Sequence, residues 1–286
     1  TIDDPSAYFH TQLYTGDGNA TQAITNDANA GDFKPDWLWI KNRSAEEHHM
    51  LANSNRGAGK RLRSDTDAAE DNNGVTSFNT DGFTTLSSAV WNANTHNYVA
   101  WQWKANGGTT STNSDGTVDV TIQVNATAGF SIMTWTGNGN TSGTVGHGLG
   151  AIPDLIINKY GLTSTSNWSV AFPKFETSKL LALNNDAAFF TASGLSGYNS
   201  SVFTDGNGAS TSGTLSYCFK NIQGYSQFGK YEGNSNTDGP FVYLGFKPAY
   251  LVLKRASGVN HWHLFDNKRD TDNVIQKHHG ADYNNA

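Results

Sequence analysis

The sequence predicts an all-β protein of tandem antiparallel β-sandwiches, of the jelly-roll or lectin-like type, with little helix. Three observations predict this fold class. Only 15% of the 286 residues are charged, and Gly, Asn, Ser and Thr take their place, a composition typical of turn-rich β proteins. A sequence pattern recurs along the chain. Finally, apolar and polar residues alternate in residues 117–124, so one face of a strand carries Val118, Val120, Ile122 and Val124.

The recurrent pattern has two anchors. The first is an aromatic residue followed by a Gly/Asn turn, at residues 14–19, 135–140 and 231–236. The second is a proline followed six residues later by a lysine, at residues 35–41, 153–159 and 248–254. Each of these Pro–Lys segments is rich in aliphatic and aromatic residues and has the length of a buried strand. We therefore expect each to be the central strand of a sheet, entered after a proline that cannot donate a ladder hydrogen bond.

Further strands follow from the same alignment. Residues 168–172 and 262–266 match each other, and residues 49–53 match them more loosely. We expect all three to be hairpin partners of the central strands. Residues 98–104 close the first copy of the pattern and residues 215–220 close the second, whereas the third copy has no closing strand. Helix is scarce, and the best candidate is a short turn at residues 65–70.

These copies predict the domain organisation. Residues 1–105 form the first β-sandwich, residues 106–116 a polar linker, residues 117–223 the second β-sandwich, and residues 224–286 a partial third unit. An unpaired apolar edge strand favours pairing with another strand. We therefore expect the third unit to be completed by the N-terminal segment or by another copy of the chain, and the protein to form a homo-oligomer, a trimer in particular.

Charge and cysteine content argue against several classes of function. The net charge of -6 and the isoelectric point near 5.8 argue against nucleic acid as a partner, because neutralising phosphates requires clustered Lys and Arg. Cys218 is the one cysteine, which excludes an intrachain disulfide and argues against a cysteine-based zinc site. No apolar run approaches the roughly 18 residues of a membrane span, so we expect no insertion into a membrane.

Motifs that could carry chemistry each have a simpler explanation. Residues 56–61 resemble a phosphate-binding loop, but Ser54 stands where a Gly is required and Arg61 where a Ser or Thr is required. His261 and His263 share a face of a strand and could chelate a transition metal, yet no third ligand is evident and a solvent-facing strand explains the same spacing.

Acidic residues give no clearer signal. Those between residues 65 and 71 could meet calcium but lack the spacing of a calcium loop. The chain has no nucleophile elbow, and no carboxylate pair stands out. We therefore expect no enzymatic activity, no catalytic residue, no cofactor and no bound metal.

Tryptophan pairs could form a binding site for sugars. Trp37 and Trp39 are two residues apart, as are Trp101 and Trp103, so each pair shares one face of a strand. Other apolar residues replace both pairs in the second copy of the pattern, and a buried core tolerates such an exchange. We therefore expect these four tryptophans in a core. Trp91 and His96, in a loop expected to be exposed, are instead the ligand-contact candidates.

Several segments together resemble a known protein family. They are residues 4–9, 14–16, 34–44, 81–83 and 98–104, with residues 146–150 and 224–229 further along. In these segments the chain is similar to a recurrent virion protein family of marine tailed bacteriophages, including phages of cyanobacteria, and the similarity covers nearly the whole chain. The motifs of the family name no catalytic or ligand residue.

The resemblance implies a non-enzymatic structural protein on the outside of a phage particle, with other virion proteins as partners. The first expectation is a part of a tail fibre or spike that attaches to the host, where a surface glycan would be its receptor. A capsid decoration or head-fibre protein is the alternative. A carbohydrate-binding module is a second alternative, whereas a depolymerase would need an acidic pair in a groove.

Overall fold

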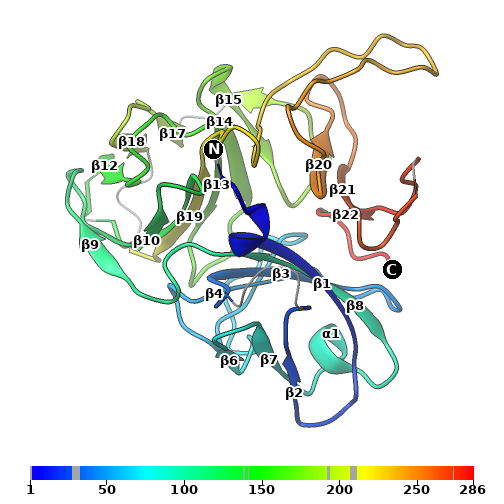
Figure 1. Cartoon of the computed structure of the whole chain (residues 1–286). Helices are drawn as coiled ribbons and strands as arrows, with labels where there is room; N and C mark the ends of the chain where they lie inside the picture. Colours follow the sequence, from blue (N-terminus) through cyan, green and yellow to red (C-terminus); the bar gives the residue numbers. More distant parts are fainter. Residues whose placement is uncertain are drawn as a thin grey trace.

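The computed structural model describes residues 2–27, 33–137, 139–140, 142–191, 194–206, 211–272 and 274–286. In these residues the strands form antiparallel sheets, and helix is confined to α1 (Ala89–Asn92) and the 3-10 turn η1 (Pro5–Ala7). The predicted all-β fold class is confirmed (Figure 1). No helix in this described part is long and apolar enough to cross a membrane.

Two sheets from the first part of the chain pack face to face. The first central sheet has the strand order β1 (Phe9–Thr15), β8 (Asn97–Trp103), β3 (Trp37–Asn42), β4 (Met50–Asn53) and β5 (Leu62–Arg63). Its cover sheet has the order β2 (Thr21–Ile24), β7 (Phe83–Leu86) and β6 (Ser77–Phe78). Leu38, Ile40 and Phe83 are among the buried side chains between the two sheets. The arrangement is a β-sandwich, as predicted.

The next part of the chain forms a larger pair of sheets. The eight-stranded sheet has the order β16 (Phe190–Thr191), β15 (Glu176–Ala182), β14 (Trp168–Phe172), β13 (Leu155–Tyr160), β19 (Thr214–Phe219), β11 (Phe130–Trp135), β10 (Val120–Asn125) and β9 (Ser111–Asn113). Its cover sheet has the order β12 (Gly143–Gly146), β18 (Val202–Asp205) and β17 (Leu195–Ser196). Val118, Val120 and Ile122, predicted to share a face, are buried in one core here. Strand β9 lies within the segment expected to be a linker.

The third central sheet is small. Its order is β20 (Tyr250–Lys254), β21 (Trp262–Asp266) and β22 (His279–Gly280), and in the described residues no strand pairs with the other edge of β20. The Pro–Lys segment that was expected to be a central strand is therefore an edge strand. The N-terminal segment does not complete this sheet, because β1 pairs with β8, Phe9 standing opposite Trp103.

Strand pairing follows the sequence prediction at the other positions. β3 pairs with β4, β13 with β14 and β20 with β21, all antiparallel. The closing segments form β8, which pairs with β3, and β19, which pairs with β13. Residues 65–70, the best helix candidate, contain a turn but no helix. The carbonyl oxygen of Asp67 accepts its hydrogen bonds from Ser166 N (2.8 Å) and Lys159 Nζ (2.9 Å), far along the chain.

One apolar core, which we call the central core, contains residues of all three central sheets. The rings of Trp37 and Tyr217 stack with centroids 4.1 Å apart and join the first sheet to the second. Trp168 Nε1 donates to the Arg63 carbonyl oxygen (2.8 Å), and Trp262 Nε1 donates to the Ala182 carbonyl oxygen (2.8 Å). The tryptophans that were expected in a core all belong to the central core: Trp37, Trp39, Trp101 and Trp103.

The lysines that end the three Pro–Lys segments connect the central sheets in a closed cycle. Each Nζ donates to a backbone carbonyl oxygen in the segment that follows a strand of another sheet: Lys159 to Asp67 (2.9 Å), Lys254 to Asp186 (3.1 Å) and Lys41 to Asn284 (3.2 Å). The three acceptors each lie four residues after the last residue of β5, β15 and β22, respectively. Burial lowers the pKa of Lys41 and Lys159 to about 8. We call this set of contacts the lysine ring.

Cys218 is fully buried in β19. Its Sγ lies 3.8 Å from the sulfur of Met133 on the neighbouring strand β11. Burial raises the pKa of the thiol, so the reactive thiolate form is suppressed.

Candidate functional site

Trp91 does not lie at the surface, so the expectation of an exposed ring is wrong. The residue belongs to α1, and its side chain is fully buried. Its Nε1 donates to the Asn73 carbonyl oxygen (2.8 Å). The physical reason is that α1 directs the indole into the core of the first sandwich, together with Phe83 and Tyr98. A ligand in solution has no access to this ring.

His96, the second ligand-contact candidate, is half-buried next to the end of β3. Its Nδ1 lies 3.0 Å from Asn42 Nδ2, which makes the ring nitrogen the acceptor, and its carbonyl oxygen accepts from Gly16 N (2.8 Å). The imidazole thus belongs to the hydrogen bonds that hold the turn before β8. The structure thus places Trp91 in a core, and His96 in a turn that its hydrogen bonds stabilise.

The acidic residues around 65–71 pair with basic side chains. Asp65 Oδ2 lies 2.6 Å from His48 Nδ1. Glu70 forms ion pairs with Arg56 and Lys60, and Asp71 with Arg61 and Arg63. The basic side chains of the segment that resembles a phosphate-binding loop therefore form ion pairs with nearby carboxylates. These pairs fasten the turns around β5.

The histidines of the third sheet also have partners within the protein. His261 Nδ1 lies 2.8 Å from Asp282 Oδ2, and the ring of His263 contacts that of His278, with centroids 4.8 Å apart. Among the described residues, no three His, Cys, Asp or Glu side chains gather as the ligands of a metal ion would.

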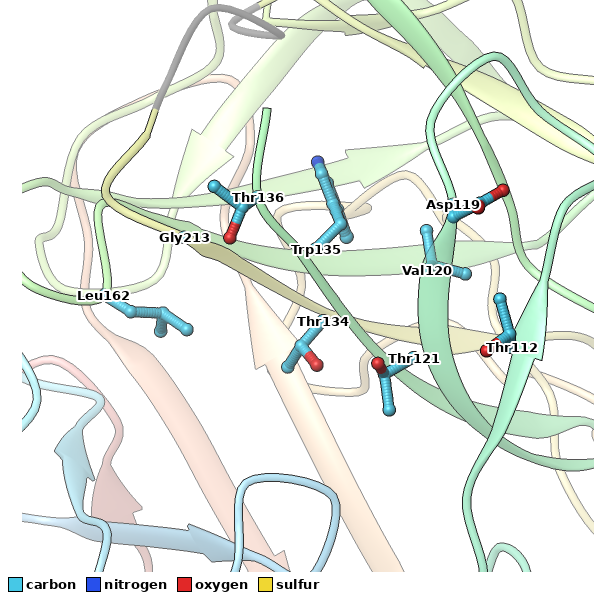
Figure 2. A pocket seen from close by; sticks show the side chains of 9 residues that line it. All are labelled: Thr112, Asp119, Val120, Thr121, Thr134, Trp135, Thr136, Leu162 and Gly213. Atoms are coloured by element: carbon cyan, nitrogen blue, oxygen red, sulfur yellow. The ribbon is translucent and has the colours of Figure 1, made fainter. Parts of the chain in front are cut away.

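A shallow depression of about 450 Å³ lies over β10 and β11 (Figure 2). Thr112, Thr121 and Thr136 are exposed around it, together with the side chain of Asp119. Trp135 is buried in its floor and donates through Nε1 to Asp205 Oδ2 (3.0 Å). The lining therefore offers hydroxyl groups and one carboxylate, without an exposed aromatic ring. One carboxylate alone does not make the pair that glycoside hydrolysis needs.

The surface along β20 is apolar. Leu251 and Val252 are each 37% exposed, whereas Leu38 and Ile156, which take the place of Leu251 in the other two Pro–Lys segments, are fully buried. A pocket of about 230 Å³ runs beside the strand, and its lining includes Pro248, Leu253, Phe265 and Ile275. The side chains that other sheets bury in a sandwich thus lie open on the third sheet.

The chain before β20 is exposed as well. Residues 229–243, which we call the exposed arm, run out from the body of the molecule without joining a sheet (Figure 1, yellow to orange). Phe241 is 89% exposed and Tyr243 77%. Exposed apolar surface of this kind marks interaction sites. The sequence signal for it was the missing closing strand of the third copy, which predicted an open edge but not an exposed arm.

The whole of this architecture falls within one family match. The chain matches the family described as Domain of unknown function (DUF7483) over residues 4–286. The chain belongs to this family. The DUF7483 match spans both sandwiches, the third central sheet and the exposed arm, so the open edge of β20 is part of the family domain. No curated protein and no solved structure matches the chain.

Proposed function

We propose that this DUF7483 protein is a non-enzymatic structural protein on the exterior of a bacteriophage particle, part of a tail fibre or spike used in host attachment. The observation that carries the proposal is the sequence resemblance to virion proteins of marine tailed phages, which extends over nearly the whole chain. The apolar surface of β20 and the exposed arm supports it independently, since a structural protein of a virion must bind other proteins.

The construction of the protein also suits an exterior part. The central core and the lysine ring connect all three central sheets, so each sheet is held to the others by side-chain contacts as well as by the connecting chain. The acidic side chains that were considered as calcium ligands, Asp65 and Glu70, are held in ion pairs. These features favour a role in which the protein keeps its shape and presents surfaces.

Immunogold labelling of intact phage with an antibody against this chain, combined with an adsorption assay, tests the proposal. We expect label on the tail and a loss of adsorption when the antibody is present. Particles that carry no label would contradict a virion location altogether.

Capsid decoration is the alternative and gives a different result in the same experiment. Label would then spread over the head, adsorption would be normal, and removal of the protein would lower the stability of the head. The surface of β20 would in that case contact the capsid.

A glycan is the receptor class that the depression over β10 and β11 favours, because its exposed threonine hydroxyls and the Asp119 carboxylate can bond to sugar hydroxyls (Figure 2). We expect binding on an array of host surface glycans to drop at least tenfold in the Asp119→Ala, Thr136→Ala double variant. The matched control, Thr177→Ala with Asp272→Ala, changes exposed residues elsewhere and should bind as the parent does. Equal binding by both variants would exclude this depression as the glycan site.

A further inference from the structure

The third central sheet lacks a strand that the first two have. β3 lies between β4 and β8, and β13 lies between β14 and β19. β20, at the corresponding position, has β21 on one side and, within the described ranges, no strand on the other. This observation on the strand order holds whether or not the protein is part of a virion.

The two closing strands show what such a strand carries. Trp103 and Trp101 of β8 stand opposite Trp37 and Trp39 of β3. In the second sheet, Phe219 and Tyr217 of β19 stand opposite Leu155 and Ile157 of β13. All four closing-strand side chains lie in the central core. The pattern is therefore two aromatic residues separated by one residue, on the face that meets the central core.

Each closing strand also reaches another sheet through the aromatic residue that comes first in the chain, Trp101 in β8 and Tyr217 in β19. Trp101 Nε1 donates to Asp266 Oδ2 at the end of β21 (3.1 Å), and the Tyr217 hydroxyl accepts from Asn53 Nδ2 at the end of β4 (2.8 Å). The residue at the corresponding end of β14 is Phe172, half-buried with its ring stacked on that of Phe175. A strand that closes the third sheet would meet Phe172 there, so an apolar residue fits this position.

The face that such a strand would cover is incomplete. Val252 is 37% exposed, whereas Trp39, its counterpart in the first sheet, is 2% exposed. The Tyr250 hydroxyl is buried, and no hydrogen-bond partner for it is present in the structure. Burying an unpaired hydroxyl and leaving apolar side chains in water both cost free energy. A paired strand would cover the apolar side chains and bring polar backbone groups to this edge.

We infer that the free edge of β20 binds an extended strand of a partner polypeptide, antiparallel to β20, with aromatic residues at two alternate positions. The main-chain ladder supplies affinity, and the alternate side chains supply specificity, as in other cases of strand addition to a sheet edge. Because the strand is antiparallel to β20, its N-terminal aromatic residue stands opposite Val252, next to Phe172. Its C-terminal aromatic residue stands opposite Tyr250.

A residue before β20 favours a separate polypeptide as the source of this strand. In the first sheet the Asp36 carboxylate holds the chain that follows β8, accepting from Ala105 N (2.7 Å), Gly107 N (2.8 Å) and Gly108 N (2.6 Å). In the second sheet Asp154 Oδ2 accepts from Asn221 N, after β19 (2.7 Å). The third sheet has Ala249 at this position, which offers no carboxylate. A strand on β20 is therefore held by its ladder and side chains, without an anchored turn.

A peptide that copies the closing strand of the first sheet tests the inference on the full-length protein. The probe is a fluorescently labelled peptide of residues 97–104, and the control peptide carries Trp101→Ser and Trp103→Ser. We expect saturable binding of the probe in fluorescence anisotropy, at least tenfold tighter than that of the control. Bound probe should also slow hydrogen–deuterium exchange of the backbone amides in residues 250–254.

A matched pair of protein variants locates the site. Val252→Lys puts a charge where the N-terminal aromatic residue of the strand would pack, and we expect at least tenfold weaker binding of the probe. Val259→Lys makes the same change at a residue that is 66% exposed and lies outside the sheet, and binding should be unchanged. The exchange measurement on the parent protein gives an answer even if the Val252 variant folds poorly.

Three results would overturn the inference. The first is equal binding of both peptides, and the second is no protection of residues 250–254. The third is a dimer in analytical ultracentrifugation that excludes the probe and dissociates in the Val252→Lys variant. That result would make a second copy of this chain, rather than a separate partner, the occupant of the edge.

Discussion

A buried charged side chain must find several hydrogen-bond partners, and Asp36 finds them in the backbone after β8. Its two oxygens accept from three backbone N–H groups and from Ser54 Oγ (2.6 Å). The side chain is fully buried. The aspartate therefore fixes the backbone of the segment that follows β8.

Replacing this carboxylate should destabilise the protein strongly. In Asp36→Ala the three N–H groups lose their acceptor in the interior, and each unpaired group costs about 1–3 kcal/mol. We expect the free energy of unfolding, measured in urea, to fall by at least about 3 kcal/mol. Asp3→Ala, a change at an exposed aspartate, should cost less than about 0.5 kcal/mol, and a similar loss in both variants would contradict this role.

Two buried histidines predict sensitivity to acid. The rings of His49 and His279 lie 6.3 Å apart. Burial lowers the pKa of both; for His279, burial together with the positive charges of Arg269, Lys41 and Arg43 lowers the pKa to about 2. Because these pKa values are lower in the folded than in the unfolded protein, their contribution to stability is complete above about pH 6.5 and is lost as the pH falls below it.

Between pH 6.5 and pH 5 each of these histidines should cost about 2 kcal/mol of unfolding free energy. Urea titrations at several pH values measure the slope. In His279→Asn the slope should drop by about one proton, while His278→Asn, at the exposed neighbouring residue, should keep the slope of the parent. An unchanged slope in His279→Asn would show that this ring is protonated in the folded protein.

At the scale of elements, the cover sheets depend on close backbone contacts. Gly82, immediately before β7, has φ +90°, and a β-carbon there would lie 2.0 Å from the Ile24 carbonyl oxygen on β2. Only glycine lets the two strands come this close. The residue belongs to one of the segments on which the resemblance to virion proteins rests.

A pair of glycine variants separates steric contact from backbone strain. Gly59 has φ +86° but no atom within 4 Å of an added β-carbon, so Gly59→Ala should cost only the strain of the left-handed backbone, about 1 kcal/mol. Gly82→Ala adds the clash with β2, and we expect a loss of at least about 3 kcal/mol. Equal losses in denaturant titrations would show that β2 moves away at little cost.

Strands with enough apolar residues to match the recurrent pattern were predictable, whereas a polar edge strand and a side-chain position set by packing were not. The Pro–Lys segments and their hairpin partners carry enough apolar residues to identify β3, β13 and β20. The exchange of Trp37 and Trp39 for aliphatic residues in the second copy correctly predicted a core. The position of Trp91 was not predictable, because its burial depends on how α1 packs on β3 and β7. Strand β9 was missed because Ser111–Asn113 is polar and lies at a sheet edge.

At the scale of the whole molecule, the central core makes the three central sheets interdependent. Trp37 packs on Tyr217 of the second sheet, and Trp101 bonds to Asp266 of the third. The lysine ring adds one contact from each sheet to another. The sequence could not show this, because a lysine at the end of a strand is usually a surface residue.

This interdependence predicts one cooperative unfolding transition for the whole chain. Differential scanning calorimetry should give a single peak whose calorimetric and van 't Hoff enthalpies agree. A fragment of residues 1–105 should lack the near-ultraviolet circular dichroism of packed tryptophans, because Trp37, Trp101 and Trp103 would face water. Two separate peaks, or a folded fragment, would show that the first sandwich is independent.

The buried thiol of Cys218 makes the natural protein ready for site-specific labelling. A maleimide dye needs a thiolate that it can reach, and Cys218 provides neither the ionisation nor the access. A cysteine introduced at an exposed residue of the arm, or beside β20, would thus be the single reactive thiol, without a prior cysteine-free background. Dyes, spin labels or gold particles could then report distances from this protein to a bound partner.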